Sequence, residues 1–143
     1  MNRLVFILVC GVVMFAACSI NQSSQEIGRN SMLKFDHVGL VTDQKHKGED
    51  FVAATRVWVT NPNEHPFRIE WLRFEPDSPV EGPVRTQPHI AFSVPDLAKA
   101  SKGMEVLIEP FDVGFAVVGF YKTEDGAVVE LMEYKENAEW KPQ

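Results

Sequence analysis

An internal repeat runs through the middle of the sequence. The segment His37-Val-Gly-Leu-Val-Thr-Asp43 resembles His89-Ile-Ala-Phe-Ser-Val-Pro-Asp96, with one inserted residue. The segment Ile69-Glu-Trp-Leu-Arg-Phe74 likewise resembles Val129-Glu-Leu-Met-Glu-Tyr134. Each copy has a histidine at the start of a strand-like run and a glutamate one residue into a later apolar run. The repeat therefore predicts a duplicated unit with a pseudo-twofold arrangement that brings the histidines and glutamates together.

The polar residues of the repeat lie on faces that leave room for a ligand. Because side chains alternate along a strand, His89 shares a face with Ala91, and His37 shares a face with Gly39. A carboxylate on an otherwise apolar strand face is costly to bury without a partner, so two of them in register call for a cation. A lone histidine at a strand start is usually structural, but the joint pattern favours a metal site. The predicted metal ligands are His37, Glu70, His89 and Glu130.

The rest of the folded body reads as short strands separated by turn signals. The strand-like runs are 33–42, 55–60, 67–74, 88–94, 104–110, 115–122 and 127–134. Residues 75–88 are rich in proline and predict a loop, whereas a short helix is expected after Asp96 as N-cap. We therefore expect one α+β domain over 32–136, with halves at about 33–75 and 88–134. The tail 137–143 reads as a loose end, on which Trp140 could still dock.

The N-terminus has the pattern of an export signal. Arg3 precedes an apolar run over residues 4–15, and small residues stand directly before Cys18. The run is shorter than the roughly 20 residues that cross a bilayer, so residues 1–17 read as a signal peptide. The end of this segment resembles the lipobox of bacterial lipoproteins, which implies acylation of Cys18, a flexible tether over 18–31 and a membrane-anchored protein of the cell envelope. The alternative is an ordinary cleaved signal that leaves a soluble secreted protein.

Composition excludes several functions. The net charge is -6 and the sequence has no basic run, so nucleic acid is not an expected partner. The two cysteines, Cys10 and Cys18, precede the predicted domain, which excludes thiol chemistry and cysteine zinc sites there. Five scattered basic residues read as surface charges that could also contact an anionic small-molecule substrate. They are Arg56, Arg68, Arg73, Arg85 and Lys122.

The motifs FDHVGLVT, PHIAFSVPDL and DGAVVELMEY resemble those of the vicinal oxygen chelate superfamily. The resemblance covers about residues 33–134. It implies two βαβββ-type modules whose sheets form a curled mixed sheet around one central metal, with ligands from the first and last strand of each module. The order His37, Glu70, His89, Glu130 is similar to that of the glyoxalase I and epimerase branches. Residues 48–54 would stand in for the helix of the first module. Members build the metal cup within one chain or between two chains, so a homodimer stays open.

This resemblance implies a metal-dependent lyase, isomerase or epimerase acting on a small oxygenated metabolite. Two imidazoles and two carboxylates suit Zn, Mn, Fe(II), Co or Ni. A metal there would act as a Lewis acid, with Glu130 as the first choice of general base and Glu70 as the second. An exported protein does not meet the cytoplasmic thiol adduct of glyoxalase I, which favours a sugar-derived or keto-acid substrate. The alternatives are an extradiol-type dioxygenase and a non-catalytic lipoprotein that binds a small ligand.

Overall fold

The computed structural model describes residues 32–138 and residue 140. The predicted signal peptide, Cys18 and the tether over 18–31 lie outside the described residues. Within the described part, no helix is long and apolar enough to cross a membrane.

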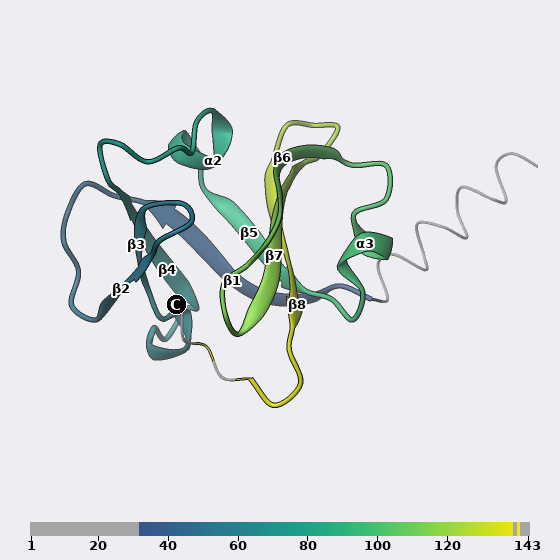
Figure 1. Ribbon diagram of the computed structural model, residues 1–143, viewed down its shortest axis with the longest axis horizontal. Helices are drawn as coiled ribbons and strands as arrows, with labels where there is room; N and C mark the ends of the chain where they lie inside the picture. Colours follow the sequence, from purple (N-terminus) through teal and green to yellow (C-terminus); the bar gives the residue numbers. More distant parts are fainter. Residues whose placement is uncertain (1–31, 139, 141–143) are drawn as a thin grey trace, which may run out of the picture. The chain divides into compact units, whose positions relative to one another are not determined.

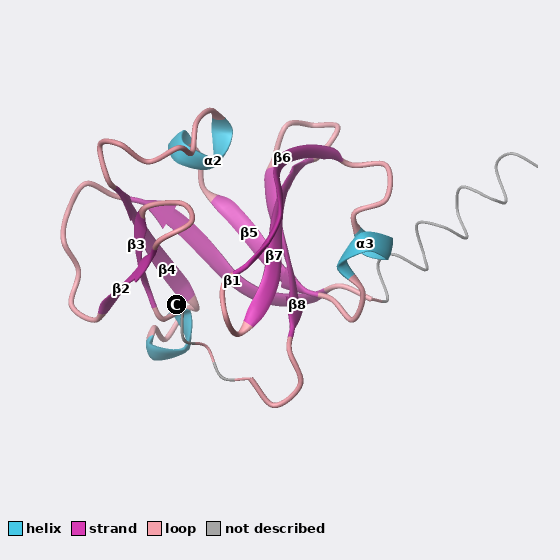
Figure 2. Cartoon of the chain, viewed as in Figure 1, coloured by secondary structure: helices cyan, strands magenta, loops and turns pink. Residues whose placement is uncertain are grey.

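Strands make up most of the described chain, and the helices are single short turns (Figure 2). The strands are β1 (Lys34–Val41), β2 (Glu49–Val52), β3 (Val57–Thr60), β4 (Ile69–Phe74), β5 (His89–Ser93), β6 (Glu105–Asp112), β7 (Ala116–Lys122) and β8 (Val128–Tyr134). The helical segments are the 3-10 turn η1 (Pro62–Glu64), α2 (Pro83–Thr86) and α3 (Leu97–Ala100). As expected from the sequence, the Asp96 side chain caps α3 by accepting a hydrogen bond from the Lys99 N–H at 2.8 Å.

The eight strands form one mixed sheet in the order β2-β3-β4-β1-β5-β8-β7-β6. The two halves of this order use the same pairings. β1 runs parallel to β4 and β5 runs parallel to β8, while the remaining pairs of each half are antiparallel. The halves meet where β1 and β5 pair in antiparallel fashion. Figure 1 shows the sheet curling so that the β2–β4 arm faces the β6–β8 arm across β1 and β5, which confirms the predicted curled mixed sheet.

The main core fills the concave side of the curled sheet. Val59 and Leu72 from one arm belong to the same buried cluster as Val118 and Met132 from the other. Trp140 joins this cluster, with its ring 5.5 Å from that of Phe115. Of the two readings of the tail, the structure therefore supports the one in which Trp140 docks.

Two segments differ from the sequence-based expectation. Residues 48–54 were expected to replace a module helix, but β2 occupies Glu49–Val52 and pairs with β3 in a hairpin. The expectation was wrong because four residues that hydrogen-bond to a neighbouring strand, with Val52 buried in the core, gain more from pairing than from one isolated helical turn. In the loop at 75–88, residues Pro83–Thr86 form α2, a turn with proline at its start.

Candidate metal centre

The strand register places the four predicted ligands symmetrically about the β1–β5 pair. In that pair His37 lies opposite Ala91, and Gly39 lies opposite His89. In the parallel pairs Gly39 is the partner of Glu70, and Ala91 is the partner of Glu130. Each glutamate is thus paired with the residue two positions after the histidine of its own half. This is the pseudo-twofold relation that the repeat predicted.

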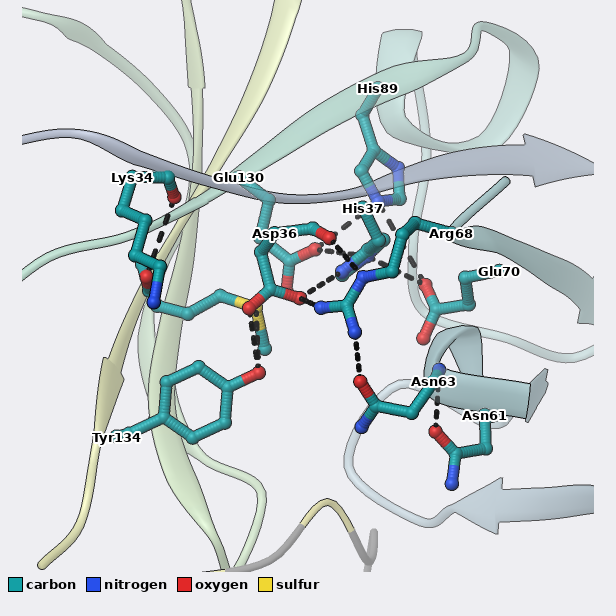
Figure 3. Close-up of polar contacts among 12 residues, drawn as sticks. Lys34, Asp36, His37, Asn61, Asn63, Arg68, Glu70, His89, Glu130 and Tyr134 are labelled. Atoms are coloured by element: carbon teal, nitrogen blue, oxygen red, sulfur yellow. Dashed lines mark hydrogen bonds and ion pairs between the residues drawn. The ribbon is translucent and has the colours of Figure 1, made fainter. Parts of the chain in front are cut away.

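The four side chains converge on one buried point (Figure 3). Each is 7% exposed or less. The His37 Nε2 atom lies 3.3 Å from the Oε2 atoms of both Glu70 and Glu130. The His89 Nε2 atom lies 3.1 Å from Glu130 Oε2 and 3.9 Å from Glu70 Oε2. One ligand atom from each residue falls within 4.8 Å of all the others.

These atoms have the spacing and the unmet bonding capacity that a cation requires. Four donors at about 2.0–2.1 Å from a tetrahedral zinc ion lie about 3.3 Å from one another. Among the described residues, the Nε2 atoms of His37 and His89 and Glu130 Oε2 are buried without a hydrogen-bond partner. Buried polar atoms normally have partners, so this convergence of orphaned donors is informative. The group could hold a metal ion, and its N₂O₂ donor set suits a borderline transition metal.

Asp36 is a site residue that the sequence analysis did not identify. Its buried carboxylate accepts a hydrogen bond from His37 Nδ1 at 2.9 Å and another from the Tyr134 hydroxyl at 2.9 Å. Arg68 lies 3.4 Å from the same carboxylate and donates its Nε–H to the Asp36 carbonyl at 2.7 Å. An ionised carboxylate only accepts, so Nδ1 of His37 carries a proton, and Nε2 faces the cluster, where it offers its lone pair to a metal when the ring is neutral. A carboxylate that accepts a hydrogen bond from the ring nitrogen turned away from the metal is the arrangement that orients metal-binding imidazoles.

A β-bulge explains how Asp36 and His37 come to the same side of the sheet. The pairing of β1 with β5 shifts register between Phe35 and His37. Strict alternation would send neighbouring side chains to opposite faces, but the bulge turns both into the buried interior. In the second half Pro88 precedes His89, and His89 Nδ1 is buried without a partner. The second-half histidine therefore lacks the support that Asp36 gives to His37.

Burial and neighbouring charges shift the pKa values of three groups at the cluster. Burial alone would lower the pKa of His37, but the charge of Glu70, the hydrogen bond to Asp36 and the close approach of the Glu130 and Glu70 carboxylates raise that pKa well above its usual value. Burial alone would raise the pKa of Glu130, but the approach of the His37 and His89 ring nitrogens to its carboxylate lowers it to about 2. Burial also works against ionised Asp36, and its hydrogen bonds with His37 and Tyr134 lower its pKa. A proton on His37 thus takes the place of a cation between the two glutamates.

The cluster borders a cavity of about 60 Å³ on the concave side of the sheet. Aliphatic and aromatic side chains from both arms form its walls, and Trp140 is one of them. Among the described residues that line it, the only charged ones are Glu70 and Glu130. A bound molecule would therefore meet the metal site at one end and an apolar surface around the rest.

The basic residues considered for an anionic substrate do not line this cavity, so that expectation is not supported. Four of them pair with carboxylates and the fifth donates to backbone carbonyls. The pairs are Arg56–Asp77 at 2.8 Å, Arg68–Asp36 at 3.4 Å, Arg73–Glu49 at 2.7 Å and Lys122–Glu105 at 3.3 Å, and Arg85 donates to the carbonyls of Glu75, Ser78 and Val80.

Comparison of the chain with protein-family models and with curated proteins finds no match. The site is therefore interpreted from its own geometry.

Proposed function

We propose that this chain is a metalloenzyme of the vicinal oxygen chelate type, with one divalent cation held by His37, Glu70, His89 and Glu130. The observation that carries the proposal is the convergence of their buried ligand atoms, several of which have no hydrogen-bond partner. A pair of histidines and a pair of carboxylates arranged without a cation would leave two negative charges in an apolar interior. A divalent ion removes that cost.

The order of the strands supports the same proposal. β1–β4 and β5–β8 each contribute a histidine from their first strand and a glutamate from their last, with the same pairing sense. We interpret them as two modules of the superfamily type, of which only the second has a helix, α3, between its first two strands. All four residues of the candidate cluster come from one chain.

The donor set and the cavity support a reaction class for this proposal. When bound, the metal would act as a Lewis acid toward a substrate with two neighbouring oxygens. Glu130 and Glu70 both line the cavity, so either carboxylate can reach a carbon-bound proton next to those oxygens and serve as general base. Asp36 holds the His37 ring in orientation, and the apolar walls exclude water. The proposed activity is a lyase, isomerase or epimerase reaction by proton transfer on a small oxygenated metabolite.

The location of the protein is a proposal from its sequence. An acylated Cys18 and a tether over 18–31 would place the domain at a membrane surface in the cell envelope. Mass spectrometry of the N-terminal peptide from the native host tests this, because acylation adds a defined mass to Cys18. An unmodified, intact N-terminus would contradict it.

Elemental mass spectrometry of the purified full-length chain tests the metal site. We expect about one equivalent of divalent metal in the wild type and a large loss in Glu130→Ala. Glu105→Ala is the matched control, because Glu105 lies on β6 and pairs with Lys122 at the surface. A wild type that takes up none of Zn, Mn, Fe(II), Co or Ni would overturn the enzyme proposal and leave a small-ligand-binding protein.

A further inference from the structure

The distribution of charge around the cavity bears on what can bind in it. Beyond Glu70 and Glu130, the lining groups that carry polar atoms are neutral, and the remaining walls are hydrocarbon. The hydroxyl of Thr55 and the indole N–H of Trp140 are buried without a hydrogen-bond partner. Each can form one hydrogen bond with a neutral group of a bound molecule. Neither of these two neutral groups can neutralise a charge on the bound molecule.

A charged group on the ligand would be poorly tolerated in these surroundings. Burying an ion in an apolar site costs several kcal/mol unless an opposite charge meets it. The nearest carboxylates repel a second anion, and the basic residues described above are engaged outside the cavity. A bound divalent metal is already neutralised by its two glutamates, so it leaves no excess positive charge for a distant anionic group.

We propose that the cavity selects a compact, uncharged substrate whose two neighbouring oxygens face the metal and whose body is largely apolar. This inference rests on the proposed metal site and narrows its substrate class. It disfavours phosphorylated sugars and those keto-acids whose carboxylate lies away from the two chelating oxygens, because that charge would have to enter the apolar end. Neutral ketones, hydroxyketones and diols with a short hydrocarbon body are compatible with the apolar walls of the cavity.

Trp140 sets the size limit. A cavity of about 150 Å³ is large enough for benzene, whereas this one is about 60 Å³. Trp140 is 7% exposed and lines both this cavity and the polar surface hollow that includes Asp36 and Arg68. Its side chain therefore separates the cavity from the surface on that side. Shortening it should admit a larger body without touching the four metal ligands.

Two hydroxamic acids with the same chelating group test the charge selection. Isovalerohydroxamic acid ends in two methyl groups, and malonic monohydroxamic acid has a carboxylate of the same shape in their place. Calorimetric titration of the full-length chain, both zinc-loaded and metal-free, gives their relative affinity. We expect the neutral probe to bind at least 10-fold more tightly to both forms. Equal binding, tighter binding of the carboxylate probe, or binding of neither would overturn the inference.

The zinc content of each sample keeps this result separate from the metal proposal. A chain that holds no zinc overturns the metal site, while the order of affinities in the metal-free titration still decides the charge selection. 2-Naphthohydroxamic acid, whose aromatic body is clearly larger than the isobutyl group, tests the size limit. We expect Trp140→Ala to gain at least 10-fold affinity for it relative to the isovaleryl probe, and Trp140→Leu to gain less. An unchanged ratio in both variants would show that Trp140 does not limit the cavity.

Discussion

The imidazole ring of His89 occupies the space directly above the α-carbon of Gly39. A β-carbon built on Gly39 would lie only 1.9 Å from Cε1 and 2.2 Å from Nε2 of that ring, although the backbone of Gly39 is not in the left-handed region that restricts other residues. The glycine is therefore required by the approach of a side chain and not by a turn. The close approach holds His89 toward the cluster from the strand opposite.

Gly39→Ala should displace His89 and weaken metal binding. The added methyl group and the ring cannot share the space, so Nε2 of His89 must move away from Glu130. We expect a loss of at least 10-fold in zinc affinity, measured by competition with a chromophoric chelator. Gly119→Ala is the matched control, because its methyl group would meet the Tyr121 hydroxyl at 2.7 Å, away from the cluster. Equal zinc affinity in Gly39→Ala and the wild type would contradict the assignment of His89 as a ligand.

Asp36→Asn should weaken the metal site without removing a ligand. The amide no longer carries the charge that fixes Nδ1 of His37 as the donor, so the ring can adopt the wrong tautomer. Loss of such a supporting carboxylate lowers metal affinity by about 10- to 100-fold. Tyr134→Phe removes only one hydrogen bond to Asp36 and should cost less. The same chelator competition measures all three proteins, and Asp36→Asn with wild-type affinity would show that this carboxylate only supports the fold.

The four clustered residues could be predicted from the sequence, but the carboxylate that hydrogen-bonds to His37 could not. His37, Glu70, His89 and Glu130 follow from the repeat, because a two-residue period and matching positions determine which strand face each occupies. Asp36 could not be found in that way, since strict alternation places it on the face opposite His37. Its position depends on the bulge between Phe35 and His37. No turn-forming residue nearby in the sequence predicts that bulge.

Pairing between segments distant in sequence accounts for the remaining differences. The strand character of Glu49–Val52 depends on its hairpin with β3, whereas its own composition gives little preference. The docking of Trp140 depends on a surface made by β7 and β8 together with the opposite arm. These contacts are tertiary, so neither periodicity nor turn signals predict them.

The metal-free protein should be most stable in mildly acidic solution. Ionised Glu130, with its pKa lowered to about 2, contributes stability above about pH 4.5 and loses it as the pH falls toward 2. Protonated His37, with its raised pKa, contributes fully below about pH 6.5 and loses that contribution as the pH rises through the raised value. Urea unfolding in EDTA across this range should show a maximum between about pH 4.5 and 6.5.

Two comparisons assign this pH profile to the cluster. His65 lies in a loop, where its ring accepts a hydrogen bond from the Phe67 N–H, so His65→Gln should keep the decline above neutral pH. Zinc should flatten that decline, because metal binding replaces the proton on His37. A metal-free protein whose free energy of unfolding stays constant from pH 6 to 9 would contradict the charged state assigned to His37.

Trp140→Ala should destabilise the domain even though the residue lies near the end of the chain. The indole is buried among residues of both arms, with its ring 5.5 Å from Phe115. Replacing a buried tryptophan by alanine costs about 3–5 kcal/mol, and we expect a loss of about this size here. Phe67→Ala is the matched control, because Phe67 is 76% exposed and should cost less than about 0.5 kcal/mol. Urea unfolding monitored by far-UV circular dichroism measures both. Equal stability of the two variants would mean that Trp140 does not hold the arms together in solution.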